Sequence, residues 1–163
     1  MNTWSELSEH EYATIWNRFY TDFKFKPDYY ERLKPAIVEP SPFVTFDLSA
    51  VNLSDKATMD IDRLFLDSFR TITSTGRVMY SLDWQHTCYR FDPHAVDDIG
   101  PIGWYPDGDY YIFLADDFSF GTFGHPWQRL ICVFGVSLLG HVENSLRNRL
   151  AVLRESTGNE IVG

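Results

Sequence analysis

Two short segments, residues 110–115 (YYIFLA) and 130–134 (LICVF), are apolar at every position. Successive side chains of a β-strand point to opposite faces of its sheet, so such strands must be covered on both faces. Residues 43–48 (FVTFDL) instead alternate, which is typical of a strand with one face in water. The sequence therefore predicts a sheet whose central strands are buried on both sides.

Three other segments have helical periodicity. Ser8 and Glu11 have the spacing of a capping box, and an aromatic stripe follows them, which we expect to pack into the core rather than to bind a partner. A second helix is predicted after Thr58, with Gly76 as its stop. A third is predicted over residues 137–154.

The order of these segments favours an α+β fold. We predict a single domain over residues 1–163, with a mainly antiparallel sheet of about five to six strands and an N-terminal, a middle and a C-terminal helix. Residues 104–105 and 110–115 flank Pro-Asp-Gly-Asp, a turn sequence that predicts a hairpin. Residues 157–163 are expected to be a frayed tail.

The charge balance excludes some classes of partner. With 14 Lys and Arg against 23 Asp and Glu, the net charge is −9, which argues against direct binding of nucleic acid and of anionic membranes. A basic protein or a cation is the better match. No signal peptide or span of about 20 apolar residues is visible, so we expect a cytoplasmic protein with buried free thiols at Cys88 and Cys132. The oligomeric state does not follow from the sequence.

Residues 91–128 combine seven aspartates and ten aromatic residues with no Lys or Arg. We predict that part of this segment is a binding surface for a basic protein partner, with aromatic anchors inside an acidic rim. Gly121 and Gly124 would allow positive φ or close chain approach in a predicted loop over residues 118–127. The candidate binding residues are Trp104, Asp107, Asp109, Asp116, Asp117, Phe120, Phe123 and Trp127.

The same segment allows a catalytic alternative. Adjacent carboxylates repel each other, so a partly buried member of the pair Asp116 and Asp117 would have a raised pKa suited to general acid catalysis. His125 is the candidate base in the same predicted loop, and Asp83 and His86 would join if their strand is a neighbour. No nucleophile motif or phosphate-binding loop accompanies these residues.

We predict no metal and no cofactor. The spacing of His86, Cys88, His94 and His125 matches no zinc motif. Asp107 and Asp109 lack the further oxygen ligands of an EF-hand, so a turn held by aspartate-to-backbone hydrogen bonds is the expectation there.

The strings SLDWQHTCYRFDP, YPDGDYYIFLADDFSFGTFGHPW and ICVFG resemble those of an uncharacterised bacterial family, domain of unknown function 2716. The resemblance implies no activity, cofactor or catalytic residue. Small acidic cytoplasmic families of this kind resemble immunity proteins that neutralise toxins. Our leading hypothesis is a non-catalytic protein-binding module of the immunity type, and the alternatives are a small hydrolase with an Asp/His site and an acidic nucleic-acid mimic.

Overall fold

The computed structural model describes residues 3–27, 35–49 and 54–156, so the predicted frayed tail lies outside it. The elements in chain order are β1 (Trp4–Glu6), α1 (Glu9–Asp22), β2 (Phe43–Asp47), α2 (Asp55–Ile72), β3 (Met79–Asp83), β4 (Tyr89–Phe91), the 3₁₀ turn η1 (Pro93–Ala95), β5 (Tyr111–Ala115), β6 (Gly121–His125), β7 (Leu130–Phe134), α3 (Val136–Arg147) and β8 (Ala151–Ser156).

The strands form one sheet in the order β1-β4-β3-β5-β6-β7-β2-β8. Every neighbouring pair is antiparallel. The predicted α+β class and antiparallel sheet are confirmed. The predicted number of five to six strands is wrong, because the described residues form eight.

The two edge strands are the difficult ones to predict. We expected a helix over residues 137–154, but α3 ends at Arg147 and residues 151–156 pair with β2 instead. Leu150 and Leu153 fit a helical spacing, yet Leu150 is buried in the turn after α3 and Leu153 is 48% exposed on the edge strand. At the other edge, β1 shows no alternation, and its position is fixed by pairing with β4, where Trp4 stacks on Phe91.

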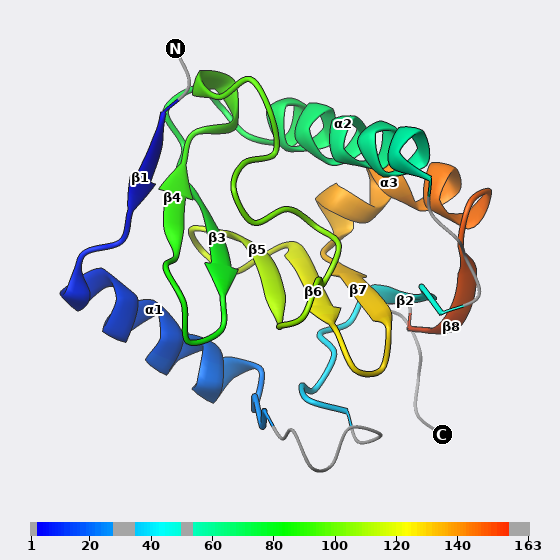
Figure 1. Cartoon of the computed structure of the whole chain (residues 1–163), viewed down its shortest axis with the longest axis horizontal. Coiled ribbons are helices and arrows are strands. Elements are labelled where there is room, and N and C mark those ends of the chain that lie inside the picture. The colour runs from blue at the N-terminus through cyan, green and yellow to red at the C-terminus, as the bar shows by residue number, and fades with distance from the viewer. Residues whose placement is uncertain (1–2, 28–34, 50–53, 157–163) are drawn as a thin grey trace.

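The sheet lies between two helical layers, with α1 on one face and α2 and α3 on the other (Figure 1). The fully apolar β5 contributes to both cores. Ile112 and Leu114 pack in the cluster that contains α1, whereas Phe113 and Ala115 pack in the cluster that contains α2 and α3. The prediction that this strand is buried on both faces is therefore confirmed.

Local sequence explains where the helices begin. The Ser8 hydroxyl accepts from the Glu11 amide, the Glu11 carboxylate accepts from the Ser8 amide, and the capping box is confirmed. Ile15, Trp16 and Phe19 of the aromatic stripe are buried, as predicted. The Ser54 side chain caps α2, so this helix begins before Thr58 and ends at Ile72, short of the predicted stop at Gly76.

Two predicted features of residues 91–128 are wrong. The hairpin around residues 106–109 does not form, because β5 pairs with β3 and β6 and residues 104–105 belong to no strand. The predicted loop over residues 118–127 contains β6. A Cβ built on Gly121 would lie 2.1 Å from the Phe113 carbonyl oxygen, so close chain approach explains this glycine.

Cys88 and Cys132 are buried free thiols, which confirms the prediction for both. Among the described residues, no helix combines the length and the hydrophobicity required to cross a membrane.

Candidate functional site

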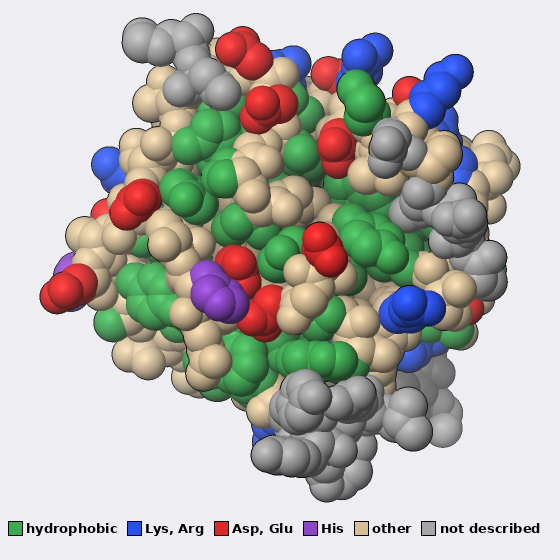
Figure 2. Space-filling view, viewed as in Figure 1, with side chains coloured by type: hydrophobic (Ala, Val, Ile, Leu, Met, Phe, Trp, Pro, Cys, Tyr) green, Lys and Arg blue, Asp and Glu red, His purple; other side chains and the backbone are tan. Residues whose placement is uncertain are grey.

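Acidic residues stand at both ends of β5, with Asp109 before the strand and Asp116 and Asp117 after it. A strand rises about 3.3 Å per residue, so the two ends lie roughly 15–20 Å apart. Figure 2 shows one face of the molecule, on which a histidine lies beside acidic side chains in a largely apolar area, while Lys and Arg lie mostly toward the margins. The two ends of β5 differ in how their carboxylates are compensated.

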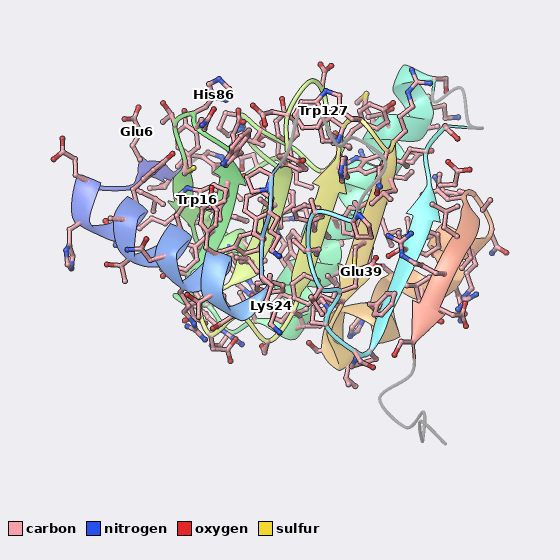
Figure 3. All side chains as sticks on the ribbon, turned by 90° about the horizontal axis from the view of Figure 1, so that it is seen from below. Glu6, Trp16, Lys24, Glu39, His86 and Trp127 are labelled. Atoms are coloured by element: carbon pink, nitrogen blue, oxygen red, sulfur yellow. The ribbon has the colours of Figure 1, made fainter. Side chains whose placement is uncertain are left out.

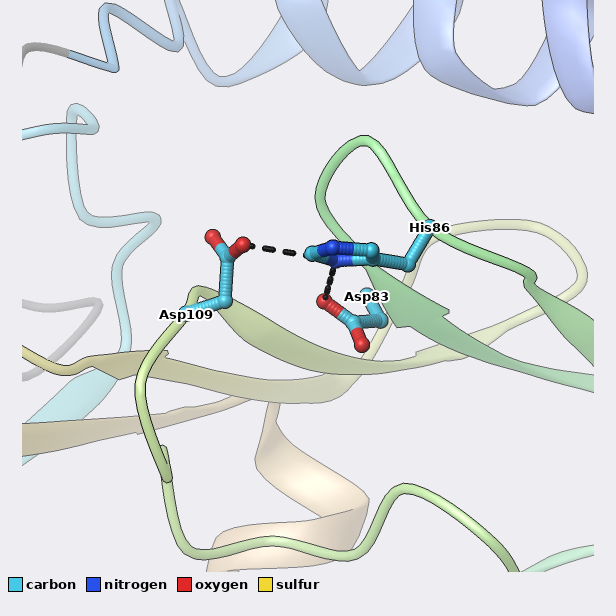
Figure 4. A group of neighbouring side chains, drawn as sticks. All are labelled: Asp83, His86 and Asp109. Carbon is cyan, nitrogen blue, oxygen red and sulfur yellow. Dashed lines mark hydrogen bonds and ion pairs between the residues drawn. The ribbon is translucent and has the colours of Figure 1, made fainter.

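At the first end, three side chains from separate segments form what we term the Asp–His–Asp cluster: Asp83, His86 and Asp109. Asp83 ends β3, opposite Tyr111 of β5. Gln85 has φ 66°, and this turn brings the His86 ring back over Asp83. His86 Nδ1 lies 3.0 Å from Asp83 Oδ1 and 3.4 Å from Asp109 Oδ2 (Figure 4).

The two carboxylates of this cluster are more shielded than the imidazole. The side chains of Asp83 and Asp109 are 19% and 18% exposed, whereas that of His86 is 61% exposed. Burial, followed by the charge of Asp83, raises the pKa of Asp109. The hydrogen bond with Asp83 raises the pKa of His86. Within the described part of the chain, neither carboxylate forms an ion pair with Lys or Arg, so one imidazole serves two acids.

At the other end, the carboxylates of Asp116 and Asp117 share one arginine partner, Arg77. Arg77 Nε lies 3.0 Å from Asp116 Oδ1, and Arg77 Nη2 lies 3.0 Å from Asp117 Oδ1. Arg18 also donates to the Asp117 carbonyl oxygen. A hydrogen bond from Ser119, assisted by Arg77, lowers the pKa of Asp117. Asp117 therefore lacks the raised pKa expected of a general acid.

His125 does not join Asp116 and Asp117. It ends β6, beside the β7 residue Leu130, whereas the turn that carries the two aspartates lies before the start of β6. The ring is buried and its Nδ1 accepts from the Gln128 amide. Burial, followed by the charge of Arg154, lowers the pKa of His125 to about 4. The predicted grouping of His125 with the two aspartates is not formed, and the imidazole is neutral at neutral pH.

Most of the predicted aromatic anchors belong to the core. Trp104, Phe120 and Phe123 are each 1% exposed, with the first two under α2 and α3 and the third under α1. These three rings therefore do not form a surface. Trp127 is half-buried against Tyr110, and Figure 3 shows it at the same edge of the molecule as His86.

The seven aspartates of residues 91–128 do not share one surface. Asp92 caps η1 and accepts from the Gly76 amide. Asp97 and Asp98 line a hollow of about 300 Å³ beside α2. Exposed Asp107 lies beside the Asp–His–Asp cluster, since its carbonyl accepts from the hydroxyl of Tyr111, the residue opposite Asp83.

The histidine and cysteine set that we considered for zinc is also not formed. Buried Cys88 interacts with the backbone of Asp83, and His94 binds the Thr73 carbonyl oxygen. Within the described residues, the three side chains whose donor atoms converge are those of the Asp–His–Asp cluster, within 4.8 Å of one another. From the sequence we named Asp83 and His86 together as catalytic candidates and Asp109 as a binding residue. We did not place Asp109 with the other two, because the pairing of β3 with β5 is a property of the fold.

The geometry defines an α+β protein with the Asp–His–Asp cluster at one end of a sheet that helices cover on both faces. The model of the family described as "Protein of unknown function (DUF2716)" matches residues 6–139, so the chain belongs to this family, as the quoted strings indicated. It is similar to the uncharacterized protein YxiI of Bacillus subtilis (strain 168), with 37% identity over 157 residues that cover 88% of this chain and 94% of that protein. No solved structure matches the chain significantly.

Proposed function

We propose that this chain is a non-catalytic, cytoplasmic protein-binding module that engages a basic partner through the surface around the Asp–His–Asp cluster. The observation that carries the proposal is the pair of shielded carboxylates, Asp83 and Asp109, which share one histidine and have no Lys or Arg partner among the described residues. Carboxylates of this kind gain more from an incoming cation than carboxylates that already bind a permanently charged arginine.

The surroundings of the cluster suit a binding surface. Exposed Asp107 lies beside it, and Trp84, Tyr111 and Trp127 are half-buried at this end of the sheet. Half-buried aromatic rings supply contact area at a low entropic cost, and the acidic groups supply orientation and selectivity. The surface that we propose therefore excludes much of the one expected from residues 104–127. Of the aromatic residues predicted as anchors, it keeps Trp127 and leaves out the three that are buried in the core.

An immunity-type inhibitor is the specific form of this proposal. The net charge of −9 would attract a positively charged toxin at long range and accelerate association at low ionic strength.

The test compares two variants that each remove two negative charges from the ends of the same strand. Tagged full-length protein is incubated with a lysate of the source bacterium at low salt, and captured proteins are identified by mass spectrometry and then titrated in purified form. We expect Asp107→Asn/Asp109→Asn to weaken binding by about tenfold or more and to reduce its salt dependence. Asp116→Asn/Asp117→Asn is the matched control and should bind like the unaltered chain, with circular dichroism confirming that both variants fold.

Equal affinity of the two variants for the captured partner would overturn the proposed surface. Absence of any stoichiometric partner would argue against the binding module itself.

A second candidate is the small hydrolase, which one observation favours. Asp83 orients a His86 ring that is 61% exposed, as a carboxylate orients an imidazole in acid–base catalysis. Of the predicted catalytic residues, this candidate site retains Asp83 and His86. Asp116, Asp117 and His125 lie elsewhere and are not part of it. Hydrolysis of simple aryl esters or phosphates that disappears in His86→Gln would support it. The nucleic-acid mimic has no comparable support, because it requires a continuous row of acids.

A further inference from the structure

We propose that Asp83, His86 and Asp109 form a binding site for one divalent transition-metal cation. The three side chains come from the end of β3, the turn after it and the segment before β5, and they offer two carboxylate oxygens and one imidazole nitrogen. This inference does not rest on the proposed protein partner, with which the cation would compete for the same two carboxylates, so its test uses the chain alone.

The spacing of the donor atoms fits one ion. Metal–ligand bonds of about 2.0–2.2 Å place neighbouring ligand atoms about 2.8–3.1 Å apart in octahedral geometry and about 3.3–3.6 Å apart in tetrahedral geometry. His86 Nδ1 lies 3.0 Å from Asp83 Oδ1 and 3.4 Å from Asp109 Oδ2, and both distances lie between the lowest and the highest of these values. The donor atoms all lie within 4.8 Å of one another. A movement of the carboxylate oxygens by about 1 Å, through side-chain rotation, therefore brings both onto one ion.

The charge of the site also fits a cation. Asp83 and Asp109 are largely shielded from water and have no Lys or Arg partner among the described residues. A proton on His86 supplies one positive charge between them, and a divalent ion at the same place supplies two. The imidazole would then bind through Nδ1 in its neutral form, with Nε2–H directed to solvent.

The donor set selects the class of metal. Ca²⁺ and Mg²⁺ prefer sites made of oxygen ligands, whereas imidazole nitrogen suits Zn²⁺ and other transition metals. A site of one nitrogen and two carboxylate oxygens should bind Zn²⁺ more tightly than Mn²⁺, following the usual order of stability. Because His86 is 61% exposed, further coordination positions face solvent, where water or a ligand atom of another molecule can bind.

The test uses chelator-treated full-length protein titrated separately with Zn²⁺, Mn²⁺, Ca²⁺ and Mg²⁺ in isothermal titration calorimetry. We expect saturable 1:1 binding of Zn²⁺, weaker binding of Mn²⁺, and no saturable binding of Ca²⁺ or Mg²⁺. His86→Ala and Asp109→Asn should each lower the Zn²⁺ affinity by about tenfold or more. The Co²⁺ absorption spectrum of the unaltered chain should change in His86→Ala, which tests for the nitrogen ligand directly.

Two controls separate this site from adventitious binding. His141→Ala removes another exposed histidine, on α3, and Asp116→Asn/Asp117→Asn removes the acidic pair at the other end of β5. Both should keep the Zn²⁺ affinity of the unaltered chain. Lack of saturable Zn²⁺ binding, equal binding of Ca²⁺, or an affinity unchanged in His86→Ala and Asp109→Asn would each overturn the proposal, whatever the outcome for a protein partner.

Discussion

The two ends of β5 carry similar acidic residues in opposite electrostatic situations. Asp116 and Asp117 form ion pairs with Arg77, and the backbone of Asp117 also accepts from Arg18. Asp83 and Asp109 share only His86 within the described residues. In the first arrangement one permanently charged guanidinium binds both carboxylates, whereas in the second the shared partner is an imidazole that is charged only when protonated. The second arrangement therefore has more capacity for another positive group.

This difference shows that a run of aspartates does not by itself locate a binding site. The adjacent pair Asp116 and Asp117 is the more conspicuous in the sequence, but its partner Arg77 is 39 residues away. Asp109 looks like an ordinary turn residue, yet it lies in the cluster whose carboxylates share a histidine and have no arginine partner within the described residues.

The largest effect should come from the rings that hold β5 and β6 together between the two ends. Phe123 is 1% exposed and packs against Phe19 and Tyr110. We expect Phe123→Ala to lower the free energy of unfolding by about 3–5 kcal/mol, because it leaves a cavity in the core. Urea denaturation measures this loss, and half-buried Trp127 provides the comparison: Trp127→Ala should cost clearly less. Equal losses would show that the core role assigned to Phe123 is wrong.

The pH dependence of stability should report His125, which lies at the same end of the sheet as the cluster. In the folded chain its pKa is about 4, lowered from the ordinary value of 6.5. Between pH 6.5 and pH 4 the unfolded chain therefore binds a proton on this residue that the folded chain does not bind. Stability should therefore fall as the pH drops from about 6.5 to 4, by on the order of 2–3 kcal/mol from this residue. Urea denaturation at several pH values measures the fall.

His125→Gln should flatten this pH profile, because glutamine has no proton to bind in this range. His141→Gln, at an exposed position on α3, should leave it unchanged. A profile that stays equally steep in His125→Gln would mean that other groups account for the acid sensitivity.

Arg77 should matter for stability at the compensated end. We expect Arg77→Ala to lower the free energy of unfolding by about 0.5–1 kcal/mol, with a smaller loss at high salt, because partly exposed ion pairs are screened. Arg90 is a suitable control, since its pair with Glu11 is longer, at 3.6 Å, and its side chain is more exposed than that of Arg77. A loss in Arg77→Ala that is independent of salt would assign its role to packing over Phe120 instead.

The smallest effect should have the opposite sign. Burial raises the pKa of Asp109, so its charged form opposes folding above that pKa and is better tolerated in the unfolded chain. Asp109→Asn should therefore raise the free energy of unfolding at pH 7 slightly, by no more than about 0.5 kcal/mol. Asp116→Asn should lower it, and a change of the same sign in both variants would remove the distinction between the two ends.

Several features could be predicted because they depend on neighbouring residues. The capping box of Ser8 and Glu11, the aromatic face of α1 and the two-sided burial of β5 follow from periodicity and local hydrogen bonding. The family also follows from local strings. The edge strands were missed because β1 and β8 are specified by the backbone of their partners rather than by their own pattern.

The sequence by itself determined the α+β class, the antiparallel sheet between helices and the presence of an acidic segment without Lys or Arg. Only the tertiary structure decided which of those aspartates pair with Arg77 and which one meets His86. The physical reason is that electrostatic compensation depends on distance in space, and the antiparallel pairing of β3 with β5 places Asp83 beside Asp109 while it brings Arg77 to Asp116.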